Sequence, residues 1–103
     1  MLAQHLFNSR GNWIAFRVGR FVYNTGGQWV GWLPWDDNDV VDRSGNYLGT
    51  IFKGGRLYKL FFKPYRGYPG YPGNPGYPAY WGYPGHADFA PIPSGAADVD
   101  EPK

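Results

Sequence analysis

The stretch NTGGQWVGW at residues 24–32 carries the strongest structural signal in the chain, because variants of it occur twice more. The first copy reads NSRGNWIAF at 8–16 and the third reads DRSGNYLGT at 42–50. All three contain Asn or Asp, two variable positions, Gly, Asn or Gln, an aromatic residue, an aliphatic residue and a small residue. Residues 53–58 resemble a degenerate fourth copy. Self-similarity of this kind indicates one structural unit used several times.

Each position of the repeat has a physical meaning. An Asn or Asp side chain can accept hydrogen bonds from the backbone two residues on, and it therefore starts a turn. Gly supplies the positive φ that the tight point of a turn requires. The aromatic and aliphatic residues that follow are typical of a strand. We assign turns or close backbone approach to five glycines: Gly11, Gly27, Gly31, Gly45 and Gly49.

A strict strand period of two predicts which side chains share a face. One face then carries Trp13, Trp29 and Tyr47 with the small residues Ala15, Gly31 and Gly49. The opposite face carries Ile14, Val30 and Leu48 with Phe16, Trp32 and Thr50. The large aromatic residues of the repeats are our candidates for core or interface positions: Trp13, Trp29, Trp32 and Tyr47.

These patterns predict an all-β fold, a small antiparallel meander of repeated short hairpins with six or seven strands. Turns are expected near 9–11, 18–20, 25–27, 34–38, 43–45 and 53–55. Helix content should be near zero, because Gly and Pro are the two poorest helix formers. The 103 residues include 16 Gly and 10 Pro.

Composition divides the chain near residue 63. Residues 1–63 form the β-repeat domain, with eight basic and four acidic side chains, and residues 64–103 have two basic and four acidic ones. Residues 64–85 are a low-complexity Tyr-Pro-Gly segment, in which Pro and Gly disfavour a regular hydrogen-bonded ladder. Residues 86–103 are small, acidic and Pro-containing, which favours a flexible tail. A Pro/Gly/Tyr-rich irregular tail is therefore expected after the meander.

The residues argue against several classes of function. The chain has no Cys and only two His, at positions 5 and 86, which leaves no thiolate site and little for a histidine metal site. No titratable pair, nucleophile or phosphate loop is recognisable, so we expect no enzyme and no cofactor. The acidic run 36–39 fails the EF-hand pattern and is interpreted as a solvated acidic turn, with an irregular carboxylate site as the alternative. No segment has the length of a membrane span or the pattern of a signal peptide, which favours a cytoplasmic location.

Self-association is the expected role. About 60 residues bury only about 60% of their unfolded surface, and both faces of the predicted strands carry large apolar side chains. An exposed apolar surface usually marks an interface, so we predict a symmetric homo-oligomer with a structural or interaction role. The Tyr-Pro-Gly residues 65–85 are a candidate contact for a protein partner. The alternative is a small β module that binds single-stranded nucleic acid or another ligand through its aromatic and basic residues.

The run 21–52 resembles the bacterial 4-fold beta flower proteins, and the resemblance covers about residues 7–60. The matching residues are Val22, Tyr23, Asn24, Gly27, Trp29, Val30, Gly31 and Trp32, followed by Val41, Asp42, Gly45, Leu48 and Gly49. The resemblance implies a small β domain around a fourfold centre, hence a homotetramer. The family has no established activity, so the resemblance supplies no catalytic positions. Residues 41–51 are also similar to the opening hairpin of PRC-barrel domains, which are small binding modules.

Overall fold

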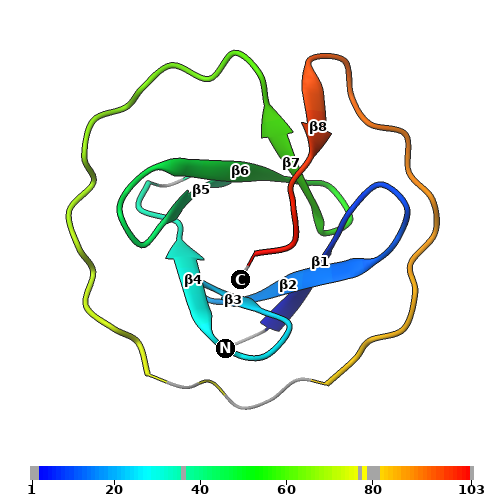
Figure 1. The fold of residues 1–103 in the computed structure, drawn as a ribbon, viewed down its shortest axis with the longest axis horizontal. Coiled ribbons are helices and arrows are strands. Elements are labelled where there is room, and N and C mark those ends of the chain that lie inside the picture. Colours follow the sequence, from blue (N-terminus) through cyan, green and yellow to red (C-terminus); the bar gives the residue numbers. More distant parts are fainter. Residues whose placement is uncertain (1–2, 36, 77, 79–81, 103) are drawn as a thin grey trace.

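The computed structural model describes residues 3–35, 37–76, 78 and 82–102. Every regular element in this part of the chain is a β-strand (Figure 1). The strands are β1 (Ala3–Phe7), β2 (Trp13–Val18), β3 (Phe21–Asn24), β4 (Trp29–Trp32), β5 (Asp39–Asp42), β6 (Tyr47–Phe52), β7 (Arg56–Leu60) and β8 (Ala96–Asp98). The all-β prediction is confirmed. The described residues include no helix long and apolar enough to cross a lipid bilayer.

The first seven strands form a closed barrel. Consecutive strands pair antiparallel along the whole meander, and β1 also pairs with β7 in parallel through Phe7 and Arg56. The amide of Phe7 donates to the carbonyl oxygen of Gly55 over 2.8 Å at the same junction. Closure joins β1 to the first residue of β7 and encloses one face of the sheet, while the rest of the β7 edge stays open to a further strand.

The three repeats form three hairpin turns with the same hydrogen bonds. In the second copy, the Asn24 side-chain oxygen accepts from the amides of Gly26 and Gln28 at 3.0 and 2.9 Å. The Gly27 amide donates to the Asn24 carbonyl, and φ of Gly27 is +83°. Asn8 and Asp42 make the equivalent bonds in the other two copies. The turn chemistry inferred from the repeat is therefore present in all three hairpins.

Each repeat continues into a β-bulge, which the sequence reasoning missed. The register shifts between Leu6 and Phe7, between Val22 and Tyr23, and between Val40 and Val41. Each shift leaves the aliphatic residue of the repeat, Ile14, Val30 or Leu48, as the extra residue opposite its partner strand. A bulge inserts one residue and reverses the alternation beyond it.

The strict two-face assignment is therefore wrong beyond each bulge. The rings of Trp13 and Phe16 stack with centroids 6.3 Å apart, although alternation placed them on opposite faces. Tyr47 and Thr50 likewise meet on one side, with their oxygens 2.7 Å apart. Positions three apart share the outer face because the bulge residue between them adds one step to the strand.

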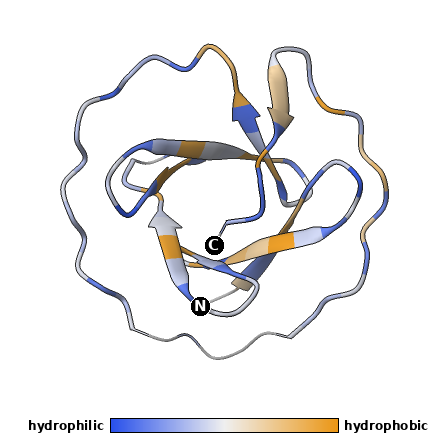
Figure 2. Ribbon diagram, in the orientation of Figure 1, coloured by the Kyte–Doolittle hydropathy of each residue, from blue (hydrophilic) through white to orange (hydrophobic). Residues whose placement is uncertain are grey.

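Apolar side chains fill the inside of the barrel, and aromatic side chains gather outside it. The inner cluster consists of Leu6, Ile14, Ala15, Val22, Val30, Leu33, Val40, Ile51, Leu57 and Val99. The outer cluster is centred on Phe16, Tyr23 and Trp29, with Trp13, Val18 and Phe21 packed against it. Figure 2 shows the apolar residues in the strands of the barrel. The small residue of each repeat belongs to the inner face, where Gly49 leaves room for Val99.

The described residues between 61 and 95 form an irregular segment, here called the belt, that runs around the barrel (Figure 1). The described part of the belt contains no strand, as expected for its Tyr-Pro-Gly units; residues 77 and 79–81 lie outside the described residues. Beyond the belt the chain re-enters the sheet, since β8 pairs with β7.

The C-terminal residues differ from the flexible tail expected for 86–103. Strand β8 places Val99 in the inner cluster, where its side chain is only 8% exposed. The Asp98 carboxylate accepts hydrogen bonds from the amide and hydroxyl of Ser9 at 2.7 and 2.6 Å. These residues belong to the folded barrel because the free edge of β7 pairs with β8, and the space above Gly49 receives Val99. The local sequence reveals neither feature.

Replacing Gly45 with Val is expected to lower the free energy of unfolding by about 1–3 kcal/mol. Gly45 has φ of +88°, and a Cβ atom there would lie 2.8 Å from Cδ1 of Tyr68 in the belt. Urea unfolding followed by tryptophan fluorescence measures the change. The exposed neighbour Ser44, changed to Ala, should alter stability by less than about 0.5 kcal/mol. Equal stability of Gly45→Val and the unmodified chain would contradict this turn geometry.

Candidate binding site between the barrel and the belt

The belt contacts the three repeats in the reverse of their order along the chain. Tyr68 lies against Gly45 of the third repeat. The ring of Tyr71 lies 5.6 Å from that of Trp29 in the second, and the ring of Tyr83 lies 5.9 Å from that of Trp13 in the first. These tyrosine side chains remain largely exposed on their outer sides. The outer face of the barrel therefore receives an aromatic ring from the belt at each repeat.

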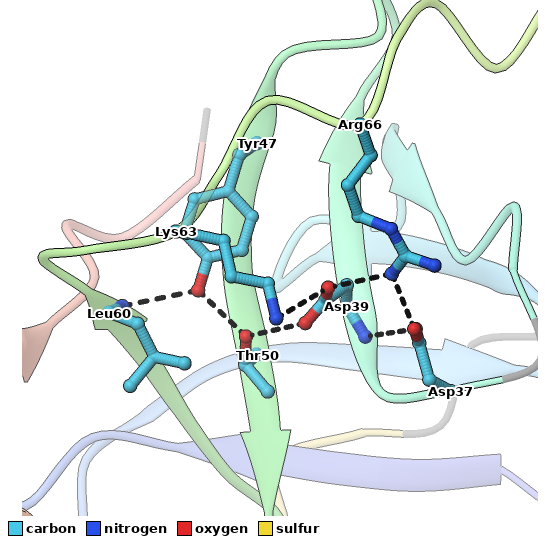
Figure 3. A network of polar contacts seen from close by, with 7 residues as sticks. All are labelled: Asp37, Asp39, Tyr47, Thr50, Leu60, Lys63 and Arg66. Atoms are coloured by element: carbon cyan, nitrogen blue, oxygen red, sulfur yellow. Dashed lines mark hydrogen bonds and ion pairs between the residues drawn. The ribbon is translucent and has the colours of Figure 1, made fainter.

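The start of the belt is held by a buried carboxylate. Asp39 begins β5 and is only 3% exposed. Its carboxylate lies 2.8 Å from Nζ of Lys63 and 2.9 Å from Nη1 of Arg66, both in the belt (Figure 3). A buried carboxylate is stable only when it is paired and hydrogen-bonded. Asp39 therefore ties the belt to the barrel.

A line of hydroxyl groups on β6 completes the surroundings of Asp39. The Thr50 hydroxyl donates to the Asp39 carboxylate over 2.9 Å. Because Thr50 has a single proton, the Tyr47 hydroxyl must donate to Thr50, at 2.7 Å. The Tyr47 oxygen accepts in turn from the Leu60 amide at 3.1 Å. The bulge in β6 places Tyr47 and Thr50 on the same side, so this network depends on it (Figure 3).

Arg66 joins a second carboxylate and an indole to the network. Its guanidinium group also binds Asp37 and lies 4.0 Å from the centroid of the Trp35 ring. Burial opposes ionisation of Asp37, but the Asp39 amide and the Arg66 guanidinium outweigh it and lower the pKa of Asp37 below its ordinary value. The hydrogen bond to Asp37 raises the pKa of Arg66. The two carboxylates and two cations balance in charge.

A cavity of about 150 Å³ opens beside this network. Trp35, Tyr47 and Tyr65 provide aromatic walls, and Val41 and Pro64 add aliphatic surface. Asp39, Lys63 and Arg66 also line it, so that charged groups of both signs meet an otherwise apolar space. Convergent polar groups in an apolar cavity are typical of a ligand site. A volume near 150 Å³ holds a single six-membered ring.

The aromatic candidates named from the repeat lie in different places. Trp29 and Trp32 are 7% and 9% exposed, whereas Trp13 and Tyr47 are half-buried. Only Tyr47 lines the cavity. Of the glycine candidates, Gly11, Gly27 and Gly45 have positive φ, whereas Gly31 and Gly49 lie within strands at points of close approach.

The solvated acidic turn that we favoured for residues 36–39 is wrong for Asp39, which is buried and paired, whereas Asp37 is exposed. Asp36 lies outside the described residues. Among the residues described, no group of three or more His, Cys, Asp or Glu is placed to hold a metal ion. The partners Lys63 and Arg66 follow Asp39 by 24 and 27 residues, and no local spacing rule connects them. One feature of the sequence could have indicated that Asp39 is buried, namely its position at the start of an aliphatic strand.

Acidification is expected to release the contact between Asp37 and Arg66. Because the pKa of Asp37 is lowered in the folded protein, the ionised carboxylate stabilises the fold at pH values above its ordinary pKa of about 3.8. This stabilisation is lost as the pH falls through the lowered pKa. The Arg66 Nε–H signal in ¹H–¹⁵N spectra should therefore shift with a midpoint below pH 3.8. Asp37→Asn should abolish this transition, and a midpoint above 3.8 in the unmodified chain would contradict the pairing. The effect on global stability should be small, because the pair is partly exposed.

Comparison of the chain with protein-family models, with curated proteins and with solved structures finds no match in any of the three. The resemblances to beta flower proteins and to PRC-barrel domains therefore remain expectations from sequence.

Proposed function

We propose that this protein is a non-enzymatic interaction module that associates with further copies of itself through the belt. The supporting observation is an exposed aromatic surface where the belt leaves β7. Phe61, Phe62 and Tyr65 are 63%, 92% and 82% exposed within five residues. Figure 2 shows the apolar stretch directly after β7. Large aromatic side chains gain free energy on leaving water, so a cluster of them on the surface favours an interface.

The reason for self-association differs from the one inferred from sequence. From the sequence we expected a sheet that covers only one of its two apolar faces. In the structure, closure of the barrel covers the inner face, and the belt covers part of the outer aromatic face, for example at Trp29. What remains for a second copy is the outer surface of the belt itself. A fourfold arrangement is the form that the beta flower resemblance implies.

Light scattering coupled to size-exclusion chromatography tests the proposal. At micromolar concentration we expect a mass that is a multiple of the 11.6 kDa protomer. The double substitution Phe61→Ser with Phe62→Ser should lower this mass toward one protomer, because it removes two adjacent exposed phenylalanine rings. A mass of 11.6 kDa at every concentration of the unmodified chain would overturn the proposal.

A matched control separates the surface from general hydrophobicity. Phe89 is also a belt phenylalanine and is 73% exposed, yet it lies in the half of the belt that leads into β8, beside Ala90, whose amide donates to the Ser9 carbonyl oxygen. Phe89→Ser should leave the mass unchanged. All three side chains are exposed, so none of these substitutions should change the unfolding midpoint measurably. A lower midpoint for the double variant would identify a folding defect.

Single-stranded nucleic acid is the second candidate ligand, and one contact favours it. The guanidinium of the exposed Arg43 lies 4.9 Å from the centroid of the Trp29 ring, an arrangement suited to base stacking beside a phosphate. Tyr71 already occupies part of the same indole, however. Oligonucleotide titrations at two salt concentrations test this function, since binding through phosphates must weaken as salt rises.

A further inference from the structure

The cavity beside Asp39 has the size and lining to receive one aromatic ring. Its volume of about 150 Å³ is bounded by the rings of Trp35, Tyr47 and Tyr65. Two nearby cations, Lys63 and Arg66, are each partly exposed, with 26% and 35% of their side-chain surface accessible. A planar group with a polar tip fits such a space better than a purely aliphatic group, because the tip can meet the charged edge.

The barrel already binds tyrosines of its own belt in this way. Tyr71 and Tyr83 each pack a ring against a repeat tryptophan. Tyr68 lies against Gly45, which also lines the cavity. Each contact places a tyrosine from a Tyr-Pro-Gly unit on the outer aromatic face. The cavity at Trp35 continues this series of sites and has room for one more ring.

We infer that this cavity accepts the tyrosine side chain of a Tyr-Pro-Gly unit from a second copy of the chain. The inference rests on the proposed self-association and identifies its contact. The ring would pack against Trp35. The phenolic hydroxyl both donates and accepts hydrogen bonds, and the cavity edge offers Lys63 and Arg66 as donors and carboxylate oxygens as acceptors. The proline after the tyrosine restricts the unbound backbone, which reduces the entropy lost on binding.

The second copy is a suitable source of such tyrosines. Residues 67–73 alone contain two consecutive Tyr-Pro-Gly units, and Tyr68 and Tyr71 there are 64% and 55% exposed. Residues 67–73 carry no charged side chain, and the carboxylates and cations beside the cavity balance in charge, so no electrostatic repulsion opposes this contact.

This contact joins two different surfaces, a cavity on one copy and a tyrosine on the next. Such a heterologous contact closes into a ring when the rotation between copies permits, and otherwise it continues as an open chain. Closure after four copies would give the fourfold arrangement that the sequence resemblance implies.

The peptide acetyl-Tyr-Pro-Gly-Tyr-Pro-Gly-amide is the probe for this site. We expect its addition to the full-length ¹⁵N-labelled chain to shift the Trp35 indole signal and the Gly45 amide signal. Trp35→Ala should weaken binding of the peptide at least tenfold. Tyr65→Ser, a change in the irregular belt, should weaken it as well without affecting the fold. Trp13→Ala is the matched control, since this half-buried tryptophan contacts a belt tyrosine away from the cavity, and its affinity for the peptide should be unchanged.

Light scattering with excess peptide separates this inference from the proposed function. Two results together would support both the cavity contact and self-association. The peptide would release protomers, and Trp35→Ala, but not Trp13→Ala, would have a lower mass than the unmodified chain. An assembly that persists with peptide and in Trp35→Ala would overturn the cavity as the contact and leave self-association in place. Shifts at Trp35 in a chain that stays at 11.6 kDa throughout would overturn the second copy as the occupant. Equal loss of peptide binding in Trp35→Ala and Trp13→Ala would also overturn the site.

Discussion

Ending the chain after Gly95 is expected to reduce the free energy of unfolding by about 3–6 kcal/mol. The truncation removes β8, the buried side chain of Val99, and the two hydrogen bonds from Ser9 to the Asp98 carboxylate. Burying a valine contributes about 1.5–3 kcal/mol, and the two hydrogen bonds to the half-buried Asp98 carboxylate together contribute about the same. A total stability of about 5–15 kcal/mol is usual for a domain, so this loss would leave the barrel marginal.

Urea unfolding monitored by tryptophan fluorescence measures this effect, and two single substitutions locate it. Val99→Ala should cost about 1–3 kcal/mol, since it removes buried methyl groups and leaves a space over Gly49. Asp100 is exposed, so Asp100→Ala should change stability by less than about 0.5 kcal/mol. An unfolding midpoint unchanged by the truncation would mean that the C-terminal residues do not belong to the barrel.

Gly31→Ala is expected to destabilise the barrel by about 3 kcal/mol or more, the second large effect. The structure places Gly31 in β4, where a Cβ atom would lie 2.3 Å from the carbonyl oxygen of Val41 in β5. That atom belongs to the backbone, so relief requires the two strands to separate. Only two residue pairs, Gly31 with Asp42 and Trp32 with Val41, join these strands. Separation would therefore disturb the weakest junction of the antiparallel meander.

A matched substitution four residues earlier distinguishes this contact from backbone strain. Gly27 belongs to the same repeat and has φ of +83°, but nothing lies within 4 Å of the position its Cβ would take. Gly27→Ala should therefore cost only about 1–2 kcal/mol, the price of a left-handed conformation for an L-residue. Chemical denaturation of both variants gives the comparison. If Gly27→Ala proved the more damaging change, strand separation at Gly31 would not be the governing effect.

The hairpins were predictable because their information is local. An Asn or Asp, a Gly three residues later and a strand of alternating character lie within nine residues in each copy. The hydrogen bonds of Asn24 with Gly26 and Gln28 connect residues two and four apart, as turn chemistry requires. The three hairpin turns follow from this pattern, and the predicted six or seven strands include the seven that the structure has between Ala3 and Leu60.

The bulges were not predictable, and half of the candidate site depends on one of them. Strict alternation along β6 would place Tyr47 and Thr50 on opposite faces of the sheet. Only the register shift between β5 and β6 brings their hydroxyl oxygens together. The other half comes from the belt. Lys63 and Arg66 meet Asp39 because the chain turns back over the barrel, and no repeat or spacing in a Tyr-Pro-Gly segment indicates where it turns.

The amino-acid sequence by itself determined the all-β meander, its turns and the irregular character of the belt, since these depend on short-range backbone preferences of Asn, Asp, Gly and Pro. Tertiary structure alone decided the closure of the barrel, the return of β8 and the pairing of Asp39 with its two cations. Each of these brings together residues far apart in the chain, β8 and β7 among them. Such contacts form where the folded barrel leaves an open strand edge, a space beside a glycine, or a buried charge that needs a partner of opposite sign.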